Sequence, residues 1–410
     1  MNAAKTALAA ALMFSFSAAS AQNYYVEEEI FLLPPAKHEQ RLAARQKAKQ
    51  DYGEPCAYLR MKDSLADKLG LHVGVDVSYT AQRVSPSGKQ TAIQGIYYPY
   101  LTWNLFKDRA LGSGTLNANY NLIRYWGAEA GTLQNRANLV AAPNDYATNQ
   151  EIFSQLSYTH TLPGELNWLS VTVGQFPLYN FDGTEFLDNQ QTALMNYALS
   201  QNASSAYPSA SLGAYVQAQK GEWTAAAGYQ DATNISGSQV RFKDAFDGKY
   251  TAFGSLAWAP SLDLGAAQYS VLYYYQPAVE KQNENVNGWS VNAQQNLGEK
   301  WAVFGRANGS TGGAVPIKNS YVLGVSWLNP FERNAQDALT VGVAYNRLSA
   351  KALGYPGEMR SSETAIEMQY VFGVGSFMTI TPDIQLYPKA GLKSGQGMST
   401  VVGLRSTIML

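Results

Sequence analysis

The chain has 410 residues, of which 46% are hydrophobic, 12% aromatic and only 15% charged, and its formal net charge is -1. About 25% charged residues is usual in soluble proteins, so this composition argues against an ordinary soluble surface. The abundant aromatic residues and the low net charge exclude a disordered chain. The near balance of acids and bases argues against a general electrostatic binder of nucleic acid or acidic membranes.

Residues 1–21 have the pattern of a secretory signal peptide. Lys5 supplies the positive region, TALAAALMFSF the apolar run, and Ala19-Ser20-Ala21 the small-residue cleavage site. The alternative, an N-terminal membrane anchor, is disfavoured because the apolar run is too short to span a bilayer. No later stretch approaches 18 consecutive apolar residues, so we expect an exported protein without a transmembrane helix.

Residues 22–70 carry helix signals. A proline opens and a glycine closes a helix pattern around the locally basic stretch 36–50. We expect a solvated periplasmic helix there, and contact of 36–50 with the cell wall or anionic lipid is the alternative. A second helix is predicted from Tyr58 to Leu69. Cys56 is the only cysteine, so no intrachain disulfide can form, and we expect a partly buried thiol.

From Leu71 onward, apolar residues alternate with small or polar residues at a period of two. In one such run, Trp301 and Val303 share one face, and Arg306 and Asn308 share the other. Strands with one face toward lipid and the other toward water produce this alternation. Sixteen strands are predicted, near 71–81, 93–106, 113–126, 150–160, 167–176, 210–219, 222–231, 250–259, 264–276, 286–297, 299–308, 318–328, 337–348, 362–372, 375–385 and 398–410.

The gaps between the predicted strands alternate in length, as the short gap 220–221 and the preceding long gap 177–209 illustrate. Short turns at one end and long loops at the other are typical of outer-membrane barrels, and an even strand number returns the C-terminus to the periplasm. We therefore predict that residues 71–410 form one 16-stranded antiparallel transmembrane β-barrel.

Two further features refine this barrel. Tyrosine and tryptophan gather at predicted strand ends, as in girdles at the headgroup level, so outer-membrane lipids are expected contacts. Pro99 and Pro382 each remove a donor from the strand ladder, and we expect bulges at both positions.

The water-facing side of the predicted strands is rich in amides and hydroxyls. Such a surface hydrogen-bonds uncharged polyols and provides no single-sign field that would select ions. A polar lining common to any water-filled barrel is the alternative interpretation. The wall residues that we expect at a constriction are Arg306, Glu367, Asp383, Gln385 and Arg405.

The longest predicted loop, 177–209, combines acidic and aromatic residues and contains no Lys or Arg. Carboxylates accept hydrogen bonds from paired sugar hydroxyls, while an aromatic ring packs on the apolar face of a pyranose. We expect this loop to fold inward so that its acids face the wall arginines, and a solvated surface loop is the alternative. The loop residues expected at the constriction are Tyr179, Asp182, Glu185 and Asp188.

Several motifs are shared with a known family. They are Glu363, Glu367 and Tyr370; Thr381-Pro382-Asp383-Ile384-Gln385; Gly403-Leu404-Arg405; Arg333 and Asp337 before Gly342-Val343-Ala344; and Leu59-Arg60, Leu65 and Gly70-Leu71. On these residues the chain resembles the carbohydrate-selective porin family, the OprB type, over roughly 57–410. The resemblance implies sixteen strands around a narrow pore that passes small sugars.

The chain also departs from that family pattern. Glu332 stands where the family has glycine, and the stretch 53–57 replaces the family's Gly-Asp-Trp-Gly-Gly. The sequence ends in Ile408-Met409-Leu410 rather than in phenylalanine. These departures mean that the resemblance does not carry over the identity of the sugar.

The sequence thus predicts a Gram-negative outer-membrane porin for facilitated diffusion of small saccharides, with no cofactor, metal, nucleic-acid partner or enzymatic turnover. A nonselective porin and a polymer-export or structural barrel are the alternatives, and assembly as a homotrimer is left open. An outer-membrane enzyme is disfavoured, because His38, His72 and His160 have no serine elbow or ligand pair around them.

Overall fold

A computed structural model describes Lys47 and residues 57–410, except for 86–89, 189, 244–247, 313–314 and 355–357. The predicted signal peptide 1–21, Cys56 and all of the basic stretch 36–50 other than Lys47 lie outside the described residues. Across the described ranges, no helix is both long enough and apolar enough to cross a membrane.

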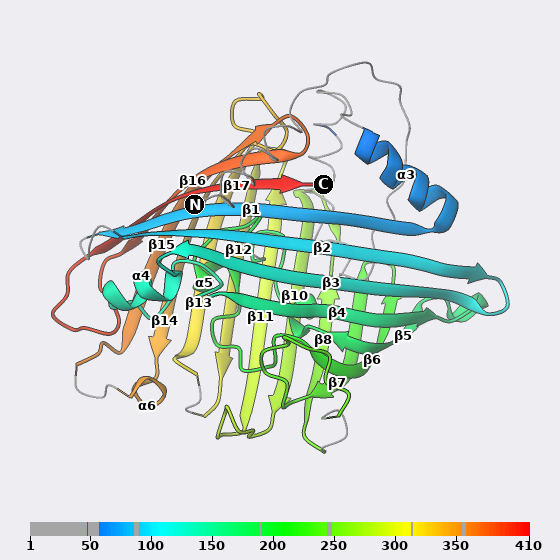
Figure 1. Ribbon diagram of the computed structural model, residues 1–410, viewed down its shortest axis with the longest axis horizontal. Helices are drawn as coiled ribbons and strands as arrows, with labels where there is room; N and C mark the ends of the chain where they lie inside the picture. The colour runs from blue at the N-terminus through cyan, green and yellow to red at the C-terminus, as the bar shows by residue number, and fades with distance from the viewer. Residues whose placement is uncertain are drawn as a thin grey trace.

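A closed ring of antiparallel strands dominates the structure (Figure 1). Strands that follow one another in the chain pair with one another, and β17 pairs with β1, which closes the ring. The two-residue strand β9 lies in the turn before β10, and β8 pairs directly with β10. Sixteen strands therefore form the wall, as the sequence predicts.

The strand bounds lie within a few residues of the predicted ranges. The strands are β1 (Leu71–Ser85), β2 (Thr91–Asp108), β3 (Gly112–Gly127), β4 (Gln150–Thr161), β5 (Leu169–Phe176), β6 (Ser211–Lys220), β7 (Trp223–Asp231), β8 (Tyr250–Trp258), β9 (Ser261–Leu262), β10 (Gly265–Gln276), β11 (Val286–Leu297), β12 (Trp301–Ser310), β13 (Ile317–Leu328), β14 (Ala338–Leu348), β15 (Ser362–Val374), β16 (Met378–Tyr387) and β17 (Ser399–Met409).

The period-two pattern sorts side chains between the two faces of the wall, as β13 illustrates. Tyr321, Leu323 and Val325 are 45%, 71% and 38% exposed on the outer face. Ser320 and Ser326 point to the inner face and are fully buried. Because successive side chains of a strand point to opposite faces, this alternation gives the barrel an apolar exterior and a polar interior.

Aromatic residues form a row of ring contacts from β12 to β15 near the short turns. The rings of Trp301 and Trp327 stack at 5.4 Å, Trp327 lies 6.1 Å from Phe331, and Phe331 lies 6.2 Å from Tyr370. Amphipathic rings prefer the headgroup level of a bilayer, so this row has the position expected of a membrane girdle.

The expectation of bulges at Pro99 and Pro382 is wrong. Pro99 stays in register with Val75, and Pro382 stays in register with Leu404. Each proline also has a second neighbouring strand, and there the pairing skips the same number of residues on both strands. The missing proline N–H therefore leaves a gap in the ladder without adding a residue to either strand. The register shift in β2 lies at 104–106 instead.

Helix α3 (Ala57–Leu69) confirms the predicted second helix and lies where β1 begins (Figure 1). Gly70 ends it with a φ of 62°, a left-handed conformation that favours glycine. The Trp103 indole N–H donates to the carbonyl of Leu69 at 3.1 Å, which ties the helix to β2. The other short helices within the described ranges are α4 (Ala130–Arg136), η2 (Gly164–Leu166), η3 (Leu178–Phe181), α5 (Tyr197–Ser200) and α6 (Ala350–Leu353).

Candidate functional site in the lumen

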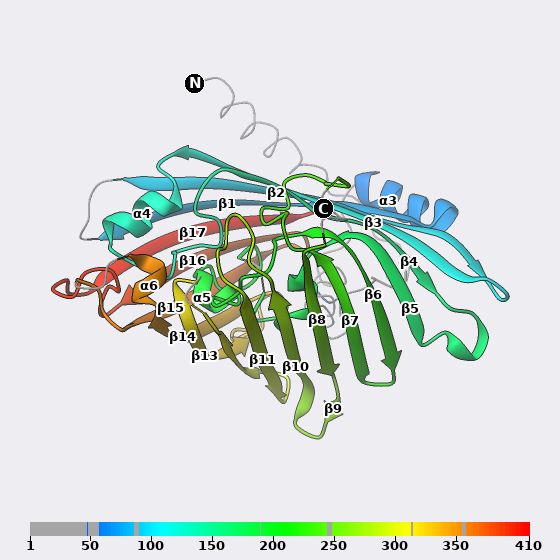
Figure 2. The same ribbon diagram turned by 90° about the horizontal axis from the view of Figure 1, so that it is seen from below.

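The segment 177–209, which we call the inner segment, packs inside the barrel, and Figure 2 shows its helix α5 within the ring of strands. In η3, the ring of Phe181 lies 5.0 Å from Tyr215 of β6 and 4.8 Å from Phe253 of β8. The side chain of Asn196 caps the start of α5. The apolar residues of this segment therefore pack on the inner wall, and the segment narrows the lumen.

Asp182 lies at the centre of a hydrogen-bonded cluster between the inner segment and the wall. Its carboxylate accepts from the side-chain amides of Asn202 at 2.8 Å and Asn292 at 3.1 Å, and from the Tyr207 hydroxyl at 3.3 Å. The oxygen of Asn292 accepts from Nε of Arg306 at 2.7 Å. Asn292 thus bridges the predicted loop acid and the predicted wall base.

The surroundings of Asp182 favour its ionised form. Burial on its own raises the pKa of Asp182, but the charge of Arg306 and hydrogen bonds from Ser290, Asn202 and Asn292 outweigh it and hold the pKa below its usual value. We therefore expect Asp182 to carry a negative charge at neutral pH.

The two predicted wall arginines bind carbonyl groups of the inner segment. Arg306 donates from Nη2 to the carbonyl of Leu187 at 2.7 Å. Arg405 donates from Nη1 to the carbonyls of Gln190 and Ala193, the latter at 2.9 Å. Hydrogen bonds from charged donors are stronger than neutral ones, so both arginines fix the backbone of the inner segment against the wall.

Among the predicted wall residues on β15 and β16, Glu367 contacts this backbone, whereas Gln385 contacts a side chain of the inner segment. Glu367 accepts from the backbone N–H of Met195 at 2.6 Å and of Asn196 at 2.8 Å. The oxygen of Gln385 accepts from the side chain of Asn196 at 3.3 Å, and Gln385 donates to Asp383 at 3.2 Å. The structure therefore brings all five predicted wall residues into the buried layer between wall and inner segment.

The other predicted residues of the inner segment have different surroundings. Glu185 and Asp188 are buried, whereas Tyr179 in η3 is half-buried. A cavity of about 900 Å³ opens at the end of the barrel with the short turns, and Glu185, Gln369 and Arg405 line part of it. Glu185 and Arg405, both largely buried, therefore border the same cavity.

A second inward segment, 128–149, was not predicted from the sequence. The carboxylate of Glu363 on β15 accepts from the backbone N–H groups of Val140 at 3.0 Å, Ala141 at 2.7 Å and Gly391 at 2.7 Å. One buried side chain therefore holds two connections between strands, 128–149 and 388–398, against the inner wall.

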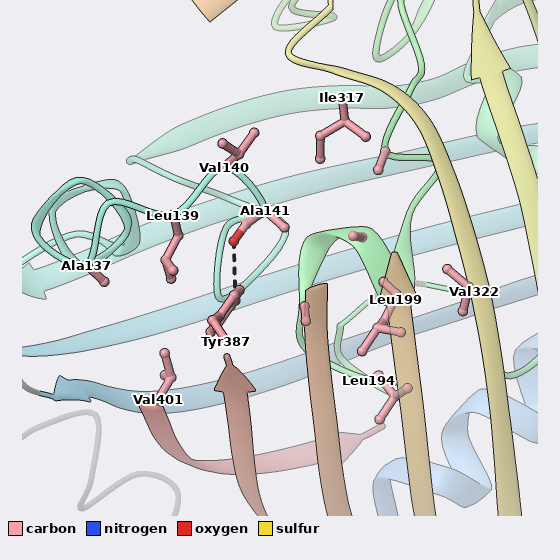
Figure 3. Close-up of a cluster of buried hydrophobic side chains, with 14 of the residues drawn as sticks. Ala137, Leu139, Val140, Ala141, Leu194, Leu199, Ile317, Val322, Tyr387 and Val401 are labelled. Atoms are coloured by element: carbon pink, nitrogen blue, oxygen red, sulfur yellow. Dashed lines mark hydrogen bonds between the residues drawn. The ribbon is translucent and has the colours of Figure 1, made fainter. Parts of the chain in front are cut away.

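An apolar cluster joins this second segment to the inner segment and to the wall (Figure 3). The Tyr387 hydroxyl donates to the carbonyl of Ala141 at 3.2 Å at its edge. The apolar run 139–142, unusual for an exposed loop, is the sequence signal that could have revealed this packing. Labelled members of the cluster are Ala137, Leu139, Val140, Ala141, Leu194, Leu199, Ile317, Val322, Tyr387 and Val401.

A glycine on the wall makes room for one aromatic contact of the inner segment. Phe304 of β12 lies opposite Gly324 of β13, and a Cβ at Gly324 would come within 2.1 Å of the Phe304 ring. Phe186 stacks on Phe304 with ring centroids 5.2 Å apart and planes 9° from parallel. Because Gly324 has no side chain, the Phe304 ring can lie over β13, and in this position it stacks with Phe186 of the inner segment.

Known proteins provide the comparison for this architecture. A family model described as the carbohydrate-selective porin, OprB family, matches residues 234–410. Porin AaxA of Chlamydia pneumoniae is 38% identical over 318 residues, which cover 77% of this chain and 72% of that protein. Porin AaxA of Chlamydia trachomatis serovar D is 36% identical over 348 residues, which cover 85% and 74% of the two chains.

The chain belongs to the OprB family of carbohydrate-selective porins. The high-pH structure of Pseudomonas putida OprB superposes with a TM-score of 0.69 at 14% identity, covering 86% of this chain and 97% of that one. The low-pH structure of the same protein gives a TM-score of 0.54 at 13% identity, covering 86% and 96%. These likenesses show the shared barrel fold, and an OprB-family porin with this barrel is an outer-membrane protein.

Proposed function

We propose that this porin is a passive channel in the outer membrane of a Gram-negative bacterium, through which small saccharides diffuse. The observation that carries this proposal is the inner segment, whose acidic and aromatic residues pack within a barrel lined by amides and hydroxyls. Carboxylates and amides pair with sugar hydroxyls, and the family name supports the same class of solute.

The residues around the inner segment have a shared role in this proposal, which is to build and fix the constriction. Charged hydrogen bonds to backbone groups hold the segment at several points, so the width of the passage does not depend on a mobile loop. A porin must release what it admits, so weak contacts at several places suit it better than one deep pocket. The proposed set is Tyr179, Asp182, Glu185, Asp188, Arg306, Glu367, Asp383, Gln385 and Arg405.

Deletion of most of the inner segment tests the proposal. In planar bilayers we expect the deletion to raise ion conductance and to abolish block of the current by saccharides. Shortening the mostly exposed stretch 238–243 of another loop is the control and should leave both properties unchanged.

Saccharide flux into liposomes measures the transport itself. We expect the intact porin to pass small saccharides faster than protein-free liposomes do. If saccharides neither permeate nor block the current, a nonselective or export function replaces this one. Unchanged conductance after deletion of the inner segment would instead refute its role as the constriction.

A further inference from the structure

The inward-facing side chains of the wall differ sharply in exposure around the ring. On the strands from β11 to β14, inward-facing polar residues such as Asn292, Asn308 and Asn346 are at most 1% exposed. The inner segment contacts these strands, since α5 lies against β13 and β14, and Asp182 accepts a hydrogen bond from Asn292 of β11. A solute in the lumen therefore cannot reach these buried side chains unless the segments that cover them move.

On β1, β2 and β3 several inward-facing side chains, such as Ser78, Gln94 and Asn117, are buried, but others at mid-strand are only partly covered. Asp76, Tyr98, Asn119 and Asn121 all point into the lumen and are all partly exposed. The strand register places Asp76 directly opposite Tyr98. The inner face of the β1–β3 wall is thus partly accessible at these four residues.

These four residues form one connected group. The side-chain amide of Asn119 donates to the Tyr98 hydroxyl at 3.0 Å and to the oxygen of Gln155 at 3.4 Å. Asp76 and Asp188 both lie close enough to Tyr98 for their charges to act on its hydroxyl. Asp188 belongs to the inner segment, so the group reaches from the wall to the facing side of the passage.

The second inward segment borders the same group. The amide of Asn121 donates to the hydroxyl of Tyr146 at 3.4 Å, and Tyr146 lies near enough to Tyr98 and Asp188 to interact with them electrostatically. Two phenol rings, two carboxylates and two amides therefore surround one stretch of the passage. Carboxylate and amide oxygens accept hydrogen bonds from hydroxyls, and a phenol ring offers a flat apolar face.

We propose that solutes cross the barrel along the β1–β3 wall, and that Asp76, Tyr98, Asn119 and Asn121 form the face that contacts them. The path follows from exposure alone, whereas the saccharide as its solute rests on the proposed function. The buried wall residues Arg306, Glu367 and Arg405 then act as positioning residues that hold the inner segment opposite this face.

Cysteine accessibility tests the path without reference to any solute. In a Cys56→Ser background, Asn121→Cys and Asn346→Cys are a matched pair, because both replace an inward-facing asparagine of a wall strand. A charged methanethiosulfonate reagent added to open channels should lower the conductance of Asn121→Cys severalfold and leave that of Asn346→Cys unchanged. Equal effects on both variants, or an effect on Asn346→Cys alone, would overturn the path.

Block by maltose measures the contact face. We expect Tyr98→Ala and Asp76→Asn to weaken the block severalfold, Tyr98→Phe to retain most of it, and Asn346→Ala to match the wild type. Heat-modifiable migration on SDS gels verifies that each variant forms a barrel. Unchanged block in both Tyr98→Ala and Asp76→Asn would refute the contact face.

The two experiments separate the path from the solute. Thiol block at residue 121 without any effect of maltose would keep the path and refute the saccharide function. Maltose flux combined with thiol block at residue 346 alone would keep the saccharide function and refute the path.

Discussion

Replacement of Glu363 by alanine should release the segment 128–149 from the wall of the barrel. The carboxylate accepts three backbone N–H groups, from Val140, Ala141 and Gly391. All three residues are buried, so water cannot replace the lost acceptor while the segment stays docked. A buried donor left unsatisfied costs about 1–3 kcal/mol, and two of the three donors, Val140 and Ala141, belong to 128–149, so the substitution should weaken docking of this segment by about 2–6 kcal/mol.

The effect should be local, because Glu363 does not contribute to the backbone ladder through its side chain. Every 1.4 kcal/mol is about a tenfold change in population, so even the lower bound of about 2 kcal/mol should raise the undocked fraction more than tenfold. Limited proteolysis within 128–149 and the noise of the open-channel current would measure this release. Glu363→Gln keeps one carbonyl acceptor and should cause a smaller effect.

Glu358→Ala provides the matched control, because Glu358 is an exposed acid in the loop that precedes β15. It should behave as the wild type in both assays. If Glu363→Ala and Glu358→Ala give the same proteolysis rate and the same current noise, the proposed anchoring of 128–149 by Glu363 is refuted.

Three further outcomes are expected. Val303→Arg places a charge on the outer face and should destabilise the barrel by about 2–4 kcal/mol if the position lies near the membrane midplane, as measured by unfolding in lipid vesicles. Burial raises the pKa of Asp145 to about 7 despite the hydrogen bonds that it accepts from the inner segment, and the nearby charge of Asp188 adds to the rise. Because the pKa of Asp145 is raised in the folded protein, the stability that this group contributes is complete below about pH 4 and is lost as the pH rises through about 7. Proteolysis within 128–149 should therefore be slower at pH 5 than at pH 8. The substitution Asp145→Asn should remove this difference. Asp76 is partly exposed on the inner wall whereas Arg306 and Arg405 are buried, so reversal potentials in a salt gradient should show a weak cation preference that Asp76→Asn reduces.

The sequence by itself determined the barrel. Alternation of apolar and polar residues is a local property of each strand, and it places Leu323 outside and Ser320 inside whatever the rest of the chain does. The alternating gap lengths then give the strand number and the direction of each strand. Helix α3 could likewise be predicted from its own residues, because its end at Gly70 is a local signal.

Only the tertiary structure decided what the polar inner face does. Arg405 and Gln190 are 215 positions apart, and no local pattern could predict that the guanidinium would bind that carbonyl. Glu363 and Glu367 share one face of β15, yet they hold different inward segments, because each meets whichever backbone passes in front of it. An inward-facing asparagine side chain is therefore buried at position 346 and partly exposed at position 121. The path of the inward segments through the closed ring decides this difference, and that path depends on contacts between residues distant in the chain.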